Sequence, residues 1–440
     1  MGNNISHRSL RVQIVRVIFI SGFVGWGGLV GAQGWQATTN LTLNADLTVR
    51  ETYDSNIYLQ NVEPSPTVPN AVKPYQESMV TSVTPRMALD WKPVSAFNLA
   101  TFYAPEFVTY HADSGENHLT HRGALTLSGQ VGVVQWEQFN TVTYIDGPTE
   151  GLTFGGPPLP SAGISGGNAP AIGGVPIRDR RAALIYRNGF RAYHAHGDFF
   201  FRPVAWSYIH DFHTEQRPDI GYQNYVDRND FTVGIEVGYK AFKDAYLVVG
   251  YRHGFQDEAP LPWSPIDYSN TYNRFLVGFE GKVTDWLKIT GVIGPDFRDF
   301  TGTTPPNFED HETVLYYDFT IVVTPTKQDT ITVLLRQFEQ PAFGNPSVYE
   351  DITWDLLWRH QFSAKFAVTT GFRAYGGEWQ LPVTRDDWIY SPSILLRYTP
   401  TKHLSGEISY TYDRATTRVP DTSGREFTRN LVSLSAKYAF

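Results

Sequence analysis

The chain of 440 residues contains no cysteine, and aromatic residues make up 15% of it. Its formal net charge is -8, because 44 acidic residues outnumber 36 basic ones. The lack of thiols excludes a disulfide framework, and the acidic balance argues against a nucleic-acid partner. Stability therefore has to come from packing and strand pairing.

The first 32 residues have the pattern of an export signal. A basic region precedes an apolar stretch over residues 17–30, and Ala32 offers a small residue at a cleavage site. We expect residues 1–32 to be a signal peptide and residues 33–440 to form one domain. An uncleaved membrane anchor is the alternative, and the short, glycine-interrupted apolar stretch disfavours it. No later stretch approaches the roughly 20 consecutive apolar residues that a membrane helix needs, so an integral membrane protein here would have to be a closed barrel.

In the segment 40–52, apolar residues at 41, 43, 45, 47 and 49 alternate with polar ones at 42, 44, 46, 48 and 50, over a length that exceeds the mean strand of soluble proteins and suits a tilted membrane crossing. The same period of two recurs along the chain. It predicts further strands at about 77–91, 96–110, 118–129, 134–146, 180–194, 198–213, 228–241, 245–256, 270–282, 287–298, 311–324, 329–339, 348–359, 365–375, 386–398, 404–414 and 426–440. With 40–52 the total is 18 strands, an even number, as bacterial barrels require.

The connections between these strands alternate in length. Short turns are predicted near 92–96, 195–197, 242–244, 283–286, 325–328, 360–364 and 399–403. Long loops are predicted near 60–76, 146–179, 213–228, 256–269, 299–310, 376–385 and 415–425. Outer-membrane barrels sort their connections in this way, with short periplasmic turns and long extracellular loops. The fold class we predict is all-β: a transmembrane antiparallel β-barrel of about 18 strands, with 16 as the alternative.

The longest connection, 146–179, is rich in glycine and proline and nearly free of charge. We expect it to be a long extracellular loop that either folds into the pore as a constriction or lies at the surface. A short repeat also marks the chain, since Thr324-Pro325-Thr326-Lys327 recurs as Thr399-Pro400-Thr401-Lys402. Propeller blades of similar period are the competing explanation, but their strands are shorter and their loops are not sorted by length.

Two sets of side chains define the faces of the predicted barrel. Aromatic rings beside short turns suit the headgroup level of a membrane, and we expect a membrane girdle from Trp91, Tyr239, Trp286, Trp358 and Tyr398. The charged residues that alternate with apolar ones would line an aqueous interior. The predicted pore-lining residues are Asp230, Glu236, Arg274, Glu280, Asp318, Arg336, Asp351, Asp355, Arg373, Arg397, Glu407 and Asp413.

The segment 431–440 alternates apolar and polar residues, with Tyr438 and Phe440 on its apolar side. Taken alone, it could be the closing strand of a soluble β-sandwich. Together with the early Tyr53-Asp54-Ser55-Asn56-Ile57-Tyr58 element and the aromatic-bounded hairpins, it resembles the outer-membrane β-barrel porins of Gram-negative bacteria. The resemblance implies that Tyr438 and Phe440 form an assembly signal for the barrel assembly machinery. It also implies diffusion or polysaccharide-related transport across the cell outer membrane, and no cofactor.

Signals for chemistry are weak. His194 and His196 lie two apart on one strand, but a metal site needs more convergent ligands. Asp386-Asp387 and the acidic run 309–312 are more typical of solvated charge than of a Ca²⁺ site. No Gly-x-Ser-x-Gly elbow supports a nucleophile, because the match at residues 163–167 lies in the predicted loop 146–179 and not between a strand and a helix. We find no phosphate-binding loop. We therefore predict no catalytic residue, no metal, no cofactor and no enzymatic activity.

The preferred functional interpretation is an outer-membrane channel for passive diffusion of small polar solutes. One alternative is a non-conducting or plugged barrel that serves attachment or polysaccharide export. Another is a soluble, secreted all-β carbohydrate-binding protein. The expected partners are outer-membrane lipid, the assembly machinery and small polar solutes, with a homo-trimer or another envelope component left open.

Overall fold

The computed structural model describes residues 35–38, 40–59, 75–146, 182–213, 216–218, 224–342, 347–380, 385–418 and 426–440. The predicted signal peptide, and the predicted loop 146–179 apart from its first residue, lie outside these described residues. No helix in the described part of the chain is long and apolar enough to cross a membrane.

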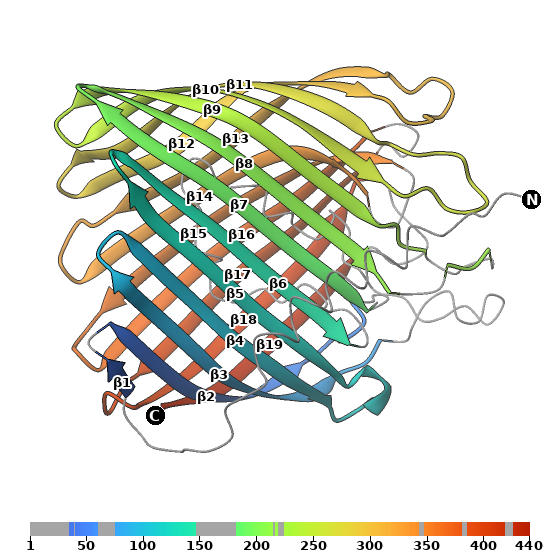
Figure 1. Ribbon diagram of the computed structural model, residues 1–440. Helices are drawn as coiled ribbons and strands as arrows, with labels where there is room; N and C mark the ends of the chain where they lie inside the picture. Colours follow the sequence, from blue (N-terminus) through green and yellow to red (C-terminus); the bar gives the residue numbers. More distant parts are fainter. Residues whose placement is uncertain are drawn as a thin grey trace, which may run out of the picture.

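The strands form one closed antiparallel sheet (Figure 1). Each strand from β2 to β18 pairs with the next along the chain, and β19 pairs with β2 to complete the circle. The predicted 18-strand barrel is thus confirmed. The strands are β2 (Leu41–Asp54), β3 (Ser78–Val94), β4 (Phe97–Tyr110), β5 (His118–Val131), β6 (Val134–Asp146), β7 (Ala183–His196), β8 (Phe199–Phe212), β9 (Arg228–Phe242), β10 (Ala245–Glu258), β11 (Asn270–Thr284), β12 (Leu287–Phe300), β13 (His311–Val323), β14 (Asp329–Pro341), β15 (Val348–Gln361), β16 (Phe366–Trp379), β17 (Arg385–Tyr398), β18 (Leu404–Thr417) and β19 (Phe427–Ala439).

Two further elements were not predicted. A short 3-10 helix, η1 (Ser114–Glu116), lies between β4 and β5 and is capped by the Asp113 side chain, which accepts from the Gly115 amide. A short strand, β1 (Trp35–Thr38), pairs with the start of β2 over Leu41–Leu43. β19 pairs with β2 only from Asp46 to Asp54, so β1 lies along the part of the β2 edge that β19 leaves unpaired.

The short turns gather at the end of the barrel where the C-terminus lies, and the longer connections at the opposite end (Figure 1). Along the strands, apolar side chains alternate with polar ones and face outward. Leu434, Val277 and Leu356 are 60%, 57% and 46% exposed. A soluble barrel would bury this set, whereas a barrel in a membrane presents it to acyl chains. Ile352 alternates along β15 in step with the exposed Trp354 and Leu356 but is only 5% exposed itself.

Between β11 and β12 the wall contains a Gly-Pro pair. Pro295 has no amide hydrogen to donate, and the β11–β12 ladder is interrupted at this residue. At Gly294 the carbonyl oxygen of Phe275 occupies the place that a Cβ would take. Only glycine therefore allows β11 and β12 to approach this closely.

The pairing of β13 with β14 stops before these strands end. It runs from Val323↔Ile331 to Tyr317↔Gln337 and goes no further, although β14 continues to Pro341 in pairing with β15. Residues 338–341 are all buried, irrespective of which face of the strand they belong to. The end of the β14–β15 hairpin has therefore left the wall and lies inside the barrel.

Candidate permeation pathway

The inner face of the barrel is formed by the residues that alternate along each strand with the exposed apolar residues. On β9, Phe231, Val233 and Ile235 are 39%, 42% and 48% exposed, while Glu236 has no exposed surface. A strand in a barrel sends successive side chains to opposite faces. The exposed set therefore faces outward, and Glu236 faces the interior.

Six of the twelve predicted pore-lining residues form ion pairs with one another. The pairs are Asp318–Arg336 at 3.6 Å, Asp355–Arg373 at 2.5 Å and Arg397–Glu407 at 2.6 Å. In each pair the two residues stand directly opposite each other on neighbouring strands. Such cross-strand pairs of opposite charge stabilise a sheet.

Glu236 is at the centre of a second group. It accepts from Arg202 Nε at 2.7 Å and from Arg252 Nη2 at 2.6 Å. Arg202 also donates from Nη2 to Glu280 at 2.8 Å. Arg202 and Arg252 were not predicted as site residues, although both alternate with exposed apolar residues. The alternation itself could have identified them.

A third group surrounds Arg298. Asp296 Oδ2 accepts from Arg274 Nε and from Arg298 Nη2, both at 2.9 Å. Arg298 Nε lies 3.3 Å from Glu339 Oε1 on β14. The Arg274 guanidinium also lies 4.1 Å from the ring centre of Tyr272. Asp296, Arg298 and Glu339 were missed, and since β12 and β14 are not neighbours in the wall, no local pattern could have joined Arg298 to Glu339.

The remaining predicted residues are held by neutral partners or by cations that were not predicted. Asp230 accepts from Gln256 at 2.9 Å, and Asp351 accepts from Tyr375 at 2.8 Å. Asp413 lies 3.9 Å from Arg429. Glu236, Arg274, Asp351 and Asp413 have 1% or less of their surface exposed, while the other eight predicted residues retain contact with solvent. Pore lining therefore stays a prediction, and these eight are its water-accessible candidates.

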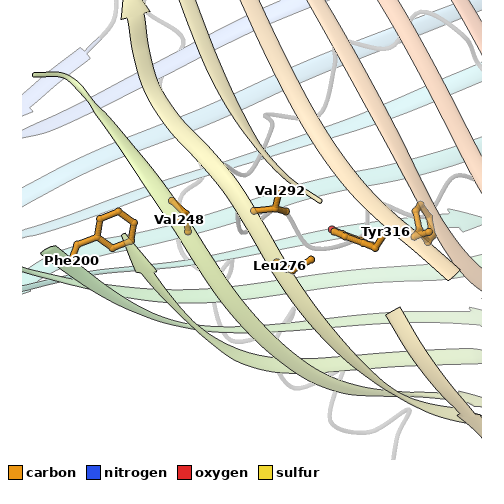
Figure 2. Close-up of a cluster of buried hydrophobic side chains, with 6 residues drawn as sticks. Phe200, Val248, Leu276, Val292 and Tyr316 are labelled. Atoms are coloured by element: carbon orange, nitrogen blue, oxygen red, sulfur yellow. The ribbon is translucent and has the colours of Figure 1, made fainter. Parts of the chain in front are cut away.

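Part of the inner face is apolar. Phe200, Val248, Leu276, Val292, Tyr316 and Phe338 form a buried cluster, with one residue from each of six strands. Figure 2 shows the labelled members in a row across the strands. Phe200 is two residues from Arg202, and Leu276 two from Arg274, so cluster and charges share one face. Here the interior is filled by side chains.

The Tyr53–Tyr58 element continues into a segment that turns into the mouth with the long loops. Leu59 packs with Tyr375, Ile389, Ala415 and Phe427 on the inner side of β16 to β19. Tyr58 donates to Asp113 Oδ2 at 2.6 Å, and burial together with this hydrogen bond raises the pKa of Tyr58. The segment 55–59 therefore narrows this mouth from one side.

The opposite mouth, at the end with the short turns, carries basic residues. Two adjoining cavities of about 300 and 330 Å³ share Arg397 and Thr399. The cations that line them are Arg359, Lys365, Arg397, Lys402 and Lys437. Glu407 also lines one cavity and pairs with Arg397, and Lys437 pairs with Asp46, so the excess of positive charge comes from Arg359, Lys365 and Lys402.

The five predicted girdle residues are all exposed beside short turns, by 41% for Trp91 and Trp358 up to 53% for Tyr398. Their contact with headgroups stays a prediction.

His194 and His196 have ring centres 6.5 Å apart. In the described part of the chain, no group of three or more His, Asp or Glu residues is placed to hold a metal ion.

The closed barrel, its outward apolar residues and its inward ion pairs define a transmembrane β-barrel of the outer-membrane type. No family model and no curated protein matches the sequence. Among solved structures, the chain is similar to the outer membrane protein OpdK of Pseudomonas aeruginosa, with 11% identity, a TM-score of 0.42, and coverage of 90% of this chain and 99% of that one.

OccAB3 of Acinetobacter baumannii is similar at 13% identity and a TM-score of 0.44, with 90% and 99% of the two chains covered. The siderophore receptor PirA of Acinetobacter baumannii is similar at 9% identity and a TM-score of 0.42, with 90% and 80% covered. These likenesses do not separate one barrel function from another. The class follows from the geometry of this chain.

Proposed function

We propose that the protein is an outer-membrane channel for passive diffusion of small polar solutes. The observation that supports it best is the inner face, where eight predicted ionisable residues keep contact with solvent inside a closed wall. Charges of both signs, paired across strands, give a polar lining that favours neither cations nor anions. The basic mouth adds a preference for anions at that end.

The test is conductance of the purified, refolded protein in a planar lipid bilayer. We expect discrete steps and a reversal potential shifted toward anions in a salt gradient. The Lys402→Glu substitution should move this potential toward cations, because Lys402 lines one of the basic cavities. Lys243→Glu is the matched control, since Lys243 lies in a turn at the same end and lines neither cavity. A protein that folds in detergent but never conducts would contradict the proposal.

A plugged barrel is the second candidate. The buried end of the β14–β15 hairpin favours it, because this segment occupies part of the interior. In that case the intact protein would not conduct, and replacement of the hairpin tip, residues 341–348, by a two-residue Gly-Gly turn would open a conductance absent from the parent. A plug formed by the predicted loop 146–179 would be removed instead by deleting that loop. Recognition of Tyr438 and Phe440 by the barrel assembly machinery, trimer formation and the absence of enzymatic activity remain predictions.

A further inference from the structure

The inward segment of the β14–β15 hairpin is defined here as residues 338–342 and 347–350. Its backbone is held by side chains of strands that are not its neighbours in the wall. Arg228 Nη1 on β9 donates to the Pro341 carbonyl at 2.7 Å, and Arg298 Nη2 on β12 donates to the Glu339 carbonyl at 2.8 Å. Gln256 on β10 donates to the same carbonyl of Glu339 at 3.4 Å.

Apolar contacts hold the tip of this segment as well. Val348 has no exposed surface and packs with Tyr268 of the β10–β11 connection and Phe300 at the end of β12. Ala342 and Tyr349 pack with Trp379 at the end of β16. The inward segment therefore extends across the interior from β16 to the region of β9–β12.

The outer face of the hairpin carries like charges in a row. Glu339 stands opposite Glu350, and Glu350 stands opposite Glu378 on β16. Like charges directly opposite each other in a sheet are destabilising. Because β14 lies inside β13 here, Glu339 faces the inner wall, where it meets Arg298. The inward position is held by polar and apolar contacts, and Arg298 there supplies a counter-charge to this row of carboxylates.

The unpaired edges of β13 and β14 are complementary. The existing register, Tyr317↔Gln337, continues without a shift to Val314 opposite Gln340. If the hairpin returned to the wall, these residues would restore the ladder between β13 and β14. Two positions of one element, each with its own set of partners, are what a conformational switch requires.

We propose that the inward segment is a movable constriction that decides which solutes pass, narrowing the pore when it is inside and widening it when β14 pairs again with β13. This inference rests on the proposed channel function. The chain contains no cysteine, so engineered pairs are free of competing thiols. The test is the double variant Val314→Cys with Gln340→Cys, whose disulfide can form only when β13 and β14 pair to their ends.

The matched control is Thr320→Cys with Leu334→Cys, because these residues are already opposite each other in the same ladder. Both proteins are refolded in detergent, oxidised and recorded in a planar bilayer before and after dithiothreitol. We expect the 314–340 disulfide to form and to enlarge the conductance step, reversibly on reduction, while the 320–334 disulfide forms and leaves the step unchanged. Arg228→Met should speed formation of the 314–340 disulfide, because it removes a contact that holds the segment inside.

A 314–340 pair that stays reduced while the control pair oxidises would overturn the inference, and so would a disulfide that forms without changing the conductance. If neither oxidised variant conducts, while gel mobility shows both to be folded, the channel function itself is contradicted. The two failures are therefore distinguishable.

Discussion

Glu236 has no exposed surface, and its two oxygens accept hydrogen bonds from two different arginines, Arg202 and Arg252. Removing charged groups from water is costly, and the cost is offset only while every partner is in place. Loss of the carboxylate would remove a buried counter-charge from both guanidinium groups and leave Arg202 paired with Glu280 alone. At the scale of single residues, the inner wall is stable only because each buried charged side chain keeps its partners of opposite charge.

The substitution Glu236→Gln should therefore lower the free energy of unfolding by about 3 to 5 kcal/mol. Urea titration of the refolded protein in detergent micelles measures it. Glu280→Gln is the control, because the Glu280 side chain is 34% exposed and shares only Arg202, so its loss should cost less than about 1 kcal/mol. Similar losses for the two variants would contradict burial as the cause.

A second residue-scale prediction concerns the outer face. Leu356→Arg should cost roughly 2 to 4 kcal/mol, since Leu356 is exposed on the apolar side that meets acyl chains. The same change at its neighbour, Leu357→Arg, points inward and should be tolerated better. Unfolding titrations in lipid vesicles compare the two, and a larger loss for Leu357→Arg would reverse the assignment of the faces.

At the scale of elements, close strand approach explains features that side-chain polarity does not. The β11–β12 pair comes together at Gly294 and Pro295, next to the buried cluster of Val292 and Leu276. A side chain at Gly294 would push the carbonyl of Phe275 away. The shape of the wall at this point is therefore set by a backbone contact.

We expect Gly294→Ala to lower the unfolding free energy by about 1 to 3 kcal/mol, the usual cost of overpacking. Gly123→Ala should change it little, because the nearest atom to the new methyl group is the Phe102 carbonyl oxygen at 3.6 Å, an ordinary contact. Both values come from the same urea titration. Equal tolerance at the two glycines would show that β12 can move away from β11 at little cost.

Most of the element pattern could be predicted from the sequence. Strands β2 to β19 lie close to their expected bounds, because alternation with period two is a direct result of a wall with one apolar and one polar side. β1 was missed because four residues are too few to show a period. The bounds of the β14–β15 hairpin were predicted, but its inward position was not, since that depends on Arg228 and Arg298, which are remote in sequence.

For the candidate site, the sequence could predict which residues face the interior but not how deeply each one is buried. Alternation identified charges such as Asp355 and Arg397, because it decides only which face a side chain takes. It could not show that Glu236 and Asp351 are buried in networks while Glu407 meets solvent. That distinction depends on partners from other strands.

At the scale of the whole molecule, closure of the sheet removes free edges, and a closed barrel resists unfolding by detergent at room temperature. We predict that the unboiled protein migrates faster than the boiled protein on a detergent gel. A variant that lacks residues 426–440 should show one position only, because β2 and β18 would both lose their β19 partner. A compact, heat-sensitive band from the truncated variant would argue that the barrel closes in another way.

The junction between β2 and β19 joins parts of the chain that are far apart in sequence. The hydroxyl groups of Thr52 and Ser433 lie 2.9 Å apart although 381 residues separate them. Contacts of such long sequence separation form late, because the entropy of the whole intervening loop is lost before they contribute. Until β2 and β19 pair, the incomplete sheet has two unpaired edge strands that can pair with other chains. We therefore expect the barrel to associate with its own copies during folding unless these edges are covered until closure.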